Sequence, residues 1–450
     1  MPVTAPDTLA VSRADLVAWY RRNRERTRRL FDLIDPAVYY TRPIALRNPI
    51  VFYEGHLPAF SVIAFLRRGV GAPPVDARLE ELFARGIDPE SEADAVPRSG
   101  ASTTWPDRRE VLEFGRAVDA AVVAAIESAP FDESRPAMRR GEGLFTALEH
   151  EAMHQETLLY MWHRLPHAHK SKPRDVRYEV DGASPATRVV EIPAGTATLG
   201  ARRDRLAFGW DNEFDEIRAE VPAFGIDAHS VTNGEFLDFI ADGGYRRREL
   251  WPDEGWTWRE REGIEHPVFW IREGASYQWR GMFEFMPLPL AWPAWVSHAE
   301  ASAYARWRGR RLPTEAEFHR AAYDTPGGEE RPFPWGSAPP DPSFGNVDFT
   351  SWEPVPAGSR AAGASAWDVH DLVGNGWEWT SSVFGPFPGF EPMPSYPEYS
   401  ADFFDGLHYT MKGASPATAK ELIRPSFRNW FRGNYPYVYA KFRTAGSTGR

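Results

Sequence analysis

The chain changes character near residue 190, and this change limits the folds that it can adopt. Of its 18 tryptophans, only Trp19, Trp105 and Trp162 lie before residue 200, and proline and glycine become more frequent after about residue 190. The first part has long stretches with helical spacing of apolar residues and no strand pattern. The second part alternates short apolar runs with Gly, Pro and Asn turns. The two parts are therefore predicted to be domains of different class.

Four stretches of the first part are predicted to be helices, because they contain few helix breakers or carry apolar residues at helical spacing. They are residues 15–34, 50–68, 107–128 and 144–165. Four long helices without strands predict an up-and-down four-helix bundle over residues 1–170. The polar stretch 171–188 contains prolines and is predicted to be a linker.

Residues 189–450 are predicted to form a mixed domain with much irregular structure around tryptophan-rich cores. Two helices are expected there, at Ser297–Arg308 and at Thr314–Ala322, the second starting after Pro313. The other residues of this part include too many turns and aromatic side chains for regular helices. The predicted fold class is α+β, in two domains.

Composition excludes several classes of protein. The 450 residues include 52 Lys and Arg against 63 Asp and Glu, a net charge of −11, which disfavours general nucleic-acid binding. The chain has no cysteine, so disulfides, thiolate metal sites and cysteine nucleophiles are excluded. No secretory signal is visible, and apolar runs such as Phe60–Leu66 are shorter than the ~20 residues of a membrane helix. We expect a cytoplasmic protein without a membrane partner.

The segment Glu149–Thr157 (EHEAMHQET) places His150 and His154 four residues apart on a predicted helix. Residues at i and i+4 share one helix face, so the two imidazoles can bind one metal ion. A pair of surface or capping histidines is the alternative. The same residues match HExxH, in which Glu151 would be the general base of a zinc hydrolase. The extended zinc motif is absent, because positions 157 and 160 are Thr and Tyr.

His56 is the most suitable third ligand. It lies in an apolar, aromatic stretch, FYEGHLPAF, where a charged imidazolium is unfavourable and a neutral, metal-bound imidazole is not. The alternative is a core histidine that is hydrogen-bonded to a backbone carbonyl. The residues alone leave both interpretations open.

Together these motifs resemble the EgtB-type non-heme iron sulfoxide synthases of ergothioneine biosynthesis. Those enzymes join an N-terminal DinB-like four-helix bundle to a C-terminal domain like the formylglycine-generating enzyme, a C-type-lectin-like mixed fold. The resemblance covers nearly the whole chain. The matching segments are Gly55-His56, His150–Thr157, Arg310–Phe318 (RRLPTEAEF), Asp371–Thr380 (DLVGNGWEWT), Phe427–Trp430 (FRNW) and Lys441–Arg443 (KFR). We interpret the RLPTEAE helix start and the GNGW turn as scaffold.

The resemblance implies Fe(II) held by His56, His150 and His154. It implies O2 as a substrate and hercynine, the trimethylammonium betaine of histidine, as the acceptor at its imidazole C2. It also implies active-site tyrosines in the segment SYPEY. We assign the proton donor to Tyr396, with Tyr399 beside it; the alternative is that both tyrosines only pack a loop against the core.

The resemblance further implies substrate contacts. Asn429 and Trp430 match residues that line the betaine pocket, and aromatic faces attract quaternary ammonium. Arg108 and Arg109 lie where the family has donor-binding arginines, which would bind a carboxylate; with a neutral donor they would be surface charges. A calcium ion in the second domain is expected by analogy, with no residues assigned to it.

Two positions depart from relatives that use γ-glutamylcysteine. Those relatives carry an acidic residue directly after the FRNW element, where this chain has Phe431 and a tyrosine-rich tail. Met153 stands inside the HExxH helix where some relatives have a polar residue. These departures resemble the selenoneine synthase (SenA) branch, which uses a selenosugar.

The predicted reaction is therefore formation of a carbon–selenium bond on hercynine. The alternative is an ergothioneine-pathway enzyme that forms a carbon–sulfur bond from cysteine or another thiol. A ligand-display protein without metal and a zinc hydrolase are the alternatives from other classes. The sequence leaves open the oligomeric state, the donor, the assignment of the proton donor between the two tyrosines and the oxidation state of the product.

Overall fold

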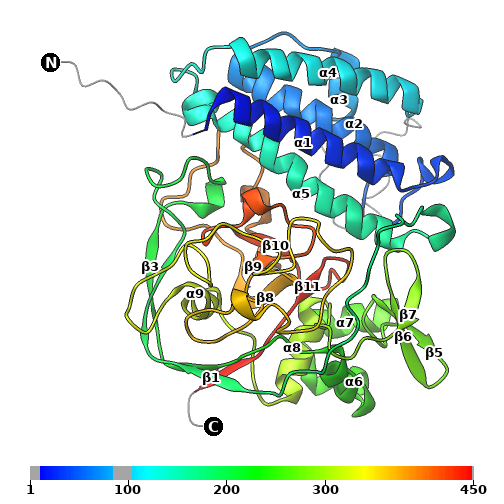
Figure 1. Cartoon of the computed structure of the whole chain (residues 1–450), viewed down its shortest axis with the longest axis vertical. Helices are drawn as coiled ribbons and strands as arrows, with labels where there is room; N and C mark the ends of the chain where they lie inside the picture. Colours follow the sequence, from blue (N-terminus) through cyan, green and yellow to red (C-terminus); the bar gives the residue numbers. More distant parts are fainter. Residues whose placement is uncertain (1–10, 85–103, 448–450) are drawn as a thin grey trace. The chain divides into compact units, whose positions relative to one another are not determined.

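The computed structural model describes residues 11–84 and 104–447, and it divides the chain into two compact units (Figure 1). The first unit comprises Met1–Lys172, Asp204–Trp210 and Glu391–Tyr399. The second unit comprises Pro173–Arg203, Asp211–Phe390 and Ser400–Arg450. The predicted α+β class is confirmed, because the first unit is helical and the second combines small sheets with helices.

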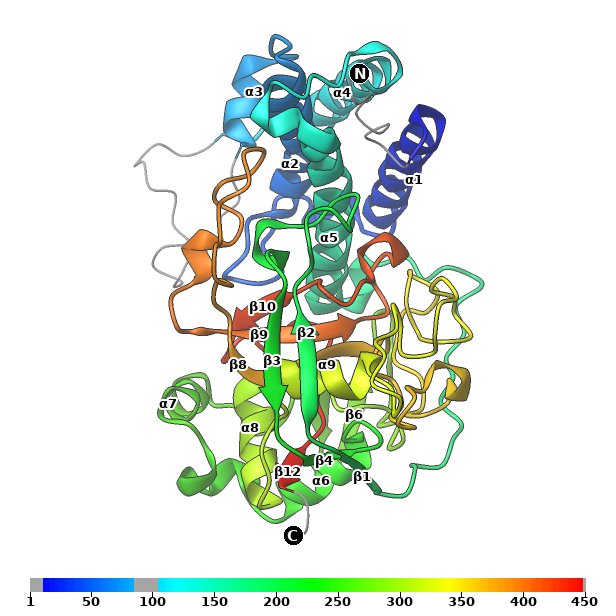
Figure 2. The same ribbon diagram turned by 90° about the vertical axis from the view of Figure 1, so that its left-hand side faces the viewer.

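Among the described residues, the first unit is a bundle of four long helices with one short helix beside it. The helices are α1 (Arg13–Asp32), α2 (Ile50–Ser61), α3 (Ala77–Leu82), α4 (Arg108–Ser128) and α5 (Glu142–Arg164). Helices α1 and α2 each pack against both α4 and α5, as Figures 1 and 2 show. The four helices start and end within about three residues of their predicted bounds, apart from α2. That helix passes into a π-helical segment, Val62–Val70.

The continuous helical stretch Ile50–Val70 is long and apolar enough, by length and composition, to cross a membrane. The sequence predicts a helix over residues 50–68 but no membrane-spanning segment, because apolar runs such as Phe60–Leu66 are shorter than the ~20 residues of a membrane helix. Because 89% of its apolar window is buried, the stretch has the environment of a core helix in the bundle.

The part of the second unit that the structure describes contains four small sheets. The strands are β1 (Val189–Ile192), β2 (Gly195–Leu199), β3 (Ile217–Val221), β4 (Phe224–Asp227), β5 (Trp270–Glu273), β6 (Ser276–Arg280), β7 (Phe285–Pro287), β8 (Gly376–Val383), β9 (His408–Ala414), β10 (Asn429–Arg432), β11 (Ala440–Lys441) and β12 (Ala445–Ser447). The largest sheet has the order β10-β9-β8-β11, in which only the β11–β8 pair is parallel. The other sheets are β1-β4-β12, β2-β3 and β5-β6-β7.

Four helices accompany these sheets: α6 (Asn233–Ala241), α7 (Asp253–Glu262), α8 (His298–Trp307) and α9 (Glu315–Tyr323). The two predicted helices correspond to α8 and α9, and each begins with a capping box. The expectation that the remaining residues form no regular helix is wrong, because α6 and α7 exist. Helix α6 has its own capping box, Thr232 with Glu235, a signal that is visible in the sequence as T-x-x-E.

The GNGW and KFR motifs are parts of the scaffold. Gly374, Asn375 and Gly376 have φ values of 101°, 64° and 134°, a left-handed turn that glycine tolerates. The turn leads into β8, where the fully buried Glu378 pairs with Lys441 Nζ at 2.8 Å and Arg443 Nη2 at 3.0 Å. These buried ion pairs join the two motifs across the largest sheet.

Candidate metal centre

His56 lies on α2 with a fixed ring orientation. A Cβ atom on the preceding Gly55 would lie 2.4 Å from the Phe83 ring, so only glycine lets Phe83 pack this close to the helix. The Phe83 carbonyl then accepts a hydrogen bond from His56 Nδ1 at 2.8 Å. Because Nδ1 carries the proton, Nε2 of His56 is the nitrogen left to bind a metal. The Gly-His pair of the sequence thus has a structural reason.

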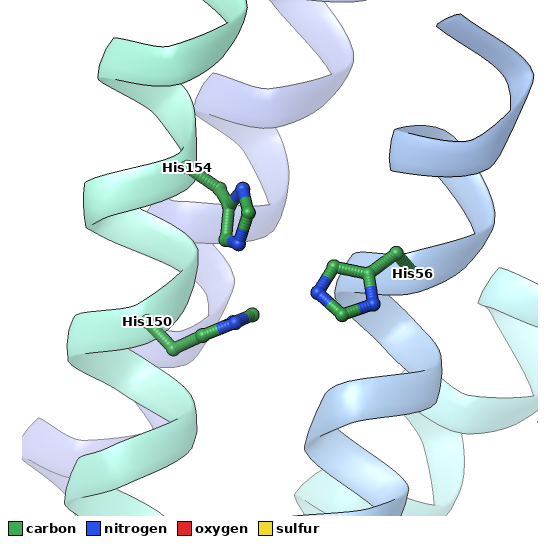
Figure 3. Close-up of side chains that lie close together, drawn as sticks. All are labelled: His56, His150 and His154. Carbon is green, nitrogen blue, oxygen red and sulfur yellow. The ribbon is translucent and has the colours of Figure 1, made fainter. Parts of the chain in front are cut away.

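His150 and His154 project from one face of α5 toward His56 (Figure 3). The ring centroid of His56 lies 5.2 Å from that of His150 and 5.1 Å from that of His154. One potential ligand nitrogen from each ring lies within 4.8 Å of the others. The structure therefore brings together the three histidines that the sequence analysis selected.

Burial keeps the three imidazoles neutral. It lowers the pKa of His56 to about 4. Burial, followed by the nearby rings of His154 and His56, also holds the pKa of His150 well below its ordinary range. The pKa of His154 is lowered by burial, and further by His56 and Arg47. Neutral imidazole is the form that binds metals, so these histidines need not lose a proton at neutral pH.

Aromatic rings pack against the three histidines, of which His56 and His150 are buried and His154 is half-buried. The ring of Phe60 lies parallel to that of His150 at 3.5 Å. Phe52 stacks on His56 at 4.9 Å, and Tyr53 lies 5.8 Å from His154. Such an apolar lining strengthens electrostatic interactions at a bound ion.

Glu151 does not have the environment of a hydrolytic base. It is 1% exposed and accepts hydrogen bonds from Arg24 Nη1 at 2.9 Å and Thr27 Oγ1 at 2.6 Å, both on α1. Burial raises the pKa of Glu151, and Arg24 opposes this increase. The carboxylate therefore joins α5 to α1, which argues against the zinc hydrolase alternative.

Both predicted tyrosines belong to the segment Glu391–Tyr399 of the first unit. The ring of Tyr396 lies 6.1 Å from that of His150 and 4.9 Å from that of Phe60. The Tyr399 hydroxyl donates to Met153 Sδ at 3.4 Å, so Met153 and Tyr399 are in contact. Tyr396 thus has a ring contact with one of the three histidines.

The two arginines at the start of α4 differ in their surroundings. Arg108 makes a bidentate ion pair with Glu54, with distances of 3.0 Å from Nε to Oε2 and 2.9 Å from Nη2 to Oε1. Tyr39 donates a further hydrogen bond to Glu54 at 2.6 Å. Glu54 lies two positions before His56, and residues at i and i+2 do not share a helix face. Arg109 is exposed. Arg108 thus binds a carboxylate of its own chain.

Asn429, Trp430 and Phe431 lie on β10 of the second unit. Trp430 stacks on Phe384 with centroids 4.2 Å apart, and Phe431 stacks on Tyr435 at 5.2 Å. The three β10 residues are half-buried. Their substrate roles remain predictions.

Two aromatic residues near the centre were not predicted from the sequence: Phe60, which stacks on His150, and Trp210, which contacts Glu149 and Tyr399. Phe60 follows His56 by four positions, so helical spacing could have placed it on the same face. Trp210 donates from Nε1 to Glu149 at 2.8 Å and stacks on Tyr399 at 3.9 Å. Its position 61 residues after Glu149 left no local signal.

The donor set fits a first-row transition metal. Nδ1 of His150 and Nδ1 of His154 are buried without a hydrogen-bond partner, as expected of rings that are oriented by a ligand rather than by the protein. Three neutral imidazoles suit iron, zinc, copper or nickel. Within residues 11–84 and 104–447, the three histidines are the one group of His, Asp or Glu side chains with metal-binding spacing. The calcium ion expected by analogy has no support.

Comparison with known proteins gives matches over both units. Residues 20–158 match the DinB superfamily, and residues 177–447 match the sulfatase-modifying factor enzyme 1-like domain. The chain is 33% identical over 453 residues to a hercynine oxygenase of Mycolicibacterium thermoresistibile, an alignment that covers 97% of this chain and 96% of that protein.

Two other relatives agree with this assignment. The hercynine oxygenase of Mycobacterium tuberculosis is 33% identical over 459 residues, covering 98% of this chain and 99% of that protein. Ergothioneine biosynthesis protein 1 of Neurospora crassa is 27% identical, covering 89% of this chain and 54% of that protein. With these similarities over almost its full length, the chain belongs to the EgtB-type non-heme iron sulfoxide synthase family.

Proposed function

We propose that this protein is a non-heme Fe(II) enzyme that uses O2 to attach selenium from a selenosugar to C2 of the hercynine imidazole, a selenoneine synthase. The observation that carries the iron assignment is the convergence of His56, His150 and His154 within ligand distance. The relatives named hercynine oxygenase support hercynine as the acceptor. In the reaction a C–H and an Se–H bond break and a C–Se bond forms; O2 is the four-electron oxidant, with one oxygen atom ending on selenium as a selenoxide and the other leaving as water with the two hydrogens.

In this proposal the three histidines hold the iron, which supplies the oxygen chemistry that no side chain can perform. Tyr396 donates a proton from its phenol, which its ring contacts with His150 and Phe60 keep beside the ligands. Tyr399 has its hydroxyl directed to Met153 Sδ and acts as a wall of the site. The aromatic lining limits the access of water.

The choice of a selenosugar rests on two observations. Phe431 stands where relatives that use γ-glutamylcysteine have an acid, and its stacking on Tyr435 puts an aromatic ring at this position in place of a carboxylate. The Arg108 guanidinium is already bound by Glu54, which reduces its capacity to bind a donor carboxylate. Both features favour an uncharged donor. The ergothioneine-type alternative, with cysteine or another thiol, is favoured by the names of the relatives.

The experiment compares donors. Protein loaded with Fe(II) is mixed with hercynine and a selenosugar, cysteine or γ-glutamylcysteine, and O2 consumption and product mass are followed. We expect O2 consumption only with both substrates present, and the highest kcat/KM with the selenosugar. Faster turnover with a thiol would support the ergothioneine-type alternative, and no hercynine-dependent O2 consumption with any donor would overturn the function.

A variant tests the role of Phe431. Phe431→Asp places an acid at this position and is expected to raise kcat/KM for γ-glutamylcysteine about tenfold. One charge-assisted hydrogen bond to the donor ammonium would stabilise the bound donor enough for a change of this size. Phe285→Asp, in an exposed position on β7 of the same unit, is the control for an added charge. An equal response of both variants would contradict the donor argument.

A further inference from the structure

Ser395 connects the tyrosine segment to the helical unit through side-chain and backbone hydrogen bonds. The residue is fully buried. Its backbone N–H and its Oγ both donate to Glu142 Oε1, at 2.9 and 2.8 Å. Its carbonyl accepts from Arg68 Nη1 at 2.9 Å. Ser395 Oγ also lies 2.8 Å from Thr146 Oγ1. Because Ser395 gives its single hydroxyl proton to Glu142, Thr146 must be the donor in this last pair.

The two side chains that bind Ser395 lie on the same stripe of α5 as the candidate iron ligands. Glu142, Thr146, His150 and His154 follow one another at intervals of four residues, so they lie on one helix face. Each interval advances about 6 Å along the axis. Ser395 is attached to the first two members of this stripe, and the next residue, Tyr396, contacts the third, His150. The hydrogen bonds of Ser395 thus fix how far along α5 the phenol lies.

Phe60 restricts the Tyr396 ring from a second direction. It lies edge-on to Tyr396, with centroids 4.9 Å and planes 67° apart. Phe60 also stacks in parallel on His150 at 3.5 Å, so it contacts both the phenol ring and the ligand beside it. Ser395 thus holds the backbone of the segment, and Phe60 packs against the Tyr396 ring. Together these contacts restrict the position of the phenol relative to His150.

We propose that Ser395, bound by Glu142 and Thr146, is a positioning residue that holds the Tyr396 phenol for proton transfer. This inference rests on the proposed function, in which Tyr396 is the proton donor. Proton transfer requires donor and acceptor at hydrogen-bond distance, and a displacement of about 1 Å can reduce a rate on the order of a hundredfold. Ser395 does not touch the histidines itself; it acts through its neighbour.

The first test is a double-mutant cycle. Ser395→Ala removes the hydroxyl and keeps the backbone contacts, and we expect kcat to fall on the order of tenfold with KM within about twofold of wild type. In a Tyr396→Phe background the same change should have no further effect, because the group that it positions is gone. An equal loss of kcat in both backgrounds, or no loss in either, would overturn the proposal.

Two further variants control for folding. Ser61→Ala removes a comparably buried hydroxyl of the same unit, whose hydrogen bond to the Leu57 carbonyl at 3.3 Å stays within α2. It should leave kcat unchanged. Thr146→Val keeps the side-chain shape and removes the hydrogen bond that Thr146 donates to Ser395. Its kcat is expected to fall, by less than in Ser395→Ala, and this variant replaces Ser395→Ala if the latter folds poorly. Unchanged kcat in a folded Thr146→Val would contradict the role of Thr146.

The second test does not depend on iron or on turnover. In the full-length protein without added metal, hydrogen exchange of the amides in Glu391–Tyr399 should become about tenfold faster in Ser395→Ala and unchanged in Ser61→Ala. Unchanged exchange in Ser395→Ala would overturn the positioning role. If the exchange result holds but no donor supports hercynine-dependent O2 consumption, the proposed function fails while the hydrogen-bonded attachment of the segment stands.

Discussion

At the scale of single residues, burial decides the chemical state of the histidines at the candidate metal centre. His56 and His150 are each 3% exposed, and apolar surroundings disfavour the charged imidazolium. The hydrogen bond from His56 to the Phe83 carbonyl settles which nitrogen carries the proton. The spacing of His150 and His154 in the sequence suggests a pair of metal ligands. Their neutral state follows from burial between the packed helices.

Replacement of His150 by alanine tests the ligand assignment. His150→Ala leaves two imidazoles, and we expect the purified protein to lose its iron, measured by elemental analysis after reconstitution and desalting. His169→Ala is the control, because His169 lies beyond α5 with 38% of its side chain exposed. Full iron content in His150→Ala would show that the ion is bound elsewhere.

His298 of the second unit predicts a pH dependence of stability. It is 5% exposed, donates from Nε2 to the Thr380 carbonyl at 3.1 Å and stacks on Tyr409 at 3.6 Å. Burial lowers the pKa of His298 to about 3. The unfolded chain takes up this proton near pH 6.5 and the folded chain does not. The contribution of His298 is therefore complete above pH 6.5 and decreases by up to about 1.4 kcal/mol per pH unit as the pH falls toward 3.

The measurement is urea denaturation of wild type and His298→Gln at several pH values between 4 and 7.5. The difference in unfolding free energy between the two proteins should shrink as the pH falls, since only the wild type loses the contribution of a neutral histidine. His266→Gln, in a half-buried position of the same unit, serves as the comparison. A constant difference over this range would contradict the prediction.

At the scale of secondary structure, α5 connects most parts of the first unit. One stripe carries Glu142, Thr146 and the two histidines, while Glu151 and Gln155 bind α1. Glu149 accepts a hydrogen bond from Trp210. The polar residues within the HExxH region thus serve packing on several sides of the helix, and only its histidines face His56.

Removal of Glu151 should separate packing from chemistry. Glu151→Ala leaves Arg24 buried with Asp119 as its remaining carboxylate partner, at 2.8 Å, and we expect the first unit to lose about 3 kcal/mol of stability. Iron content should be unchanged. Glu25→Ala, which breaks an exposed pair with Arg29, should cost less than about 1 kcal/mol. Stability is measured by urea denaturation. Lost turnover at full stability and iron content would instead support a catalytic Glu151.

At the scale of the whole molecule, the first unit is assembled from three separate stretches of the chain. Segments 204–210 and 391–399 follow the bundle in sequence by tens to hundreds of residues, yet they belong to its compact unit. The second segment brings both tyrosines, and the first brings Trp210. The bundle alone would therefore contain the histidines and Tyr53 but neither Tyr396 nor Tyr399.

Trp210 is the residue with which to test this assembly. Trp210→Ala removes the hydrogen bond to Glu149 and the stack on Tyr399, and we expect a loss of about 3 kcal/mol in the stability of the first unit. Hydrogen exchange should accelerate in segments 204–210 and 391–399 and not in β8 or β9. Trp335→Ala, which disrupts a stack on Phe333 in the second unit, is the control. Faster hydrogen exchange of segments 204–210 and 391–399 in Trp335→Ala, and not in Trp210→Ala, would show that they belong to the second unit.

The sequence by itself determined the helices of the bundle, the capped starts of α8 and α9, and the pairing of His150 with His154. These features depend on contacts within a few residues, where helical periodicity and capping chemistry are sufficient. The sequence also predicted the α+β class, because the spacing of apolar and polar residues changes near residue 190 from a helical pattern to short runs between turns. Helices α6 and α7 were missed since their aromatic, glycine-containing sequences resemble loops.

Only the tertiary structure decided which distant groups share one site. The third imidazole comes from α2, and the nearby phenol comes from residue 396, some 246 positions after His150. The internal partners of Glu151 and Arg108 were equally hidden, because a carboxylate or guanidinium can bind protein, metal or substrate with the same atoms. Which partner such a group binds depends on the packing of elements that are far apart in the chain. The residues next to it in sequence therefore do not predict the partner.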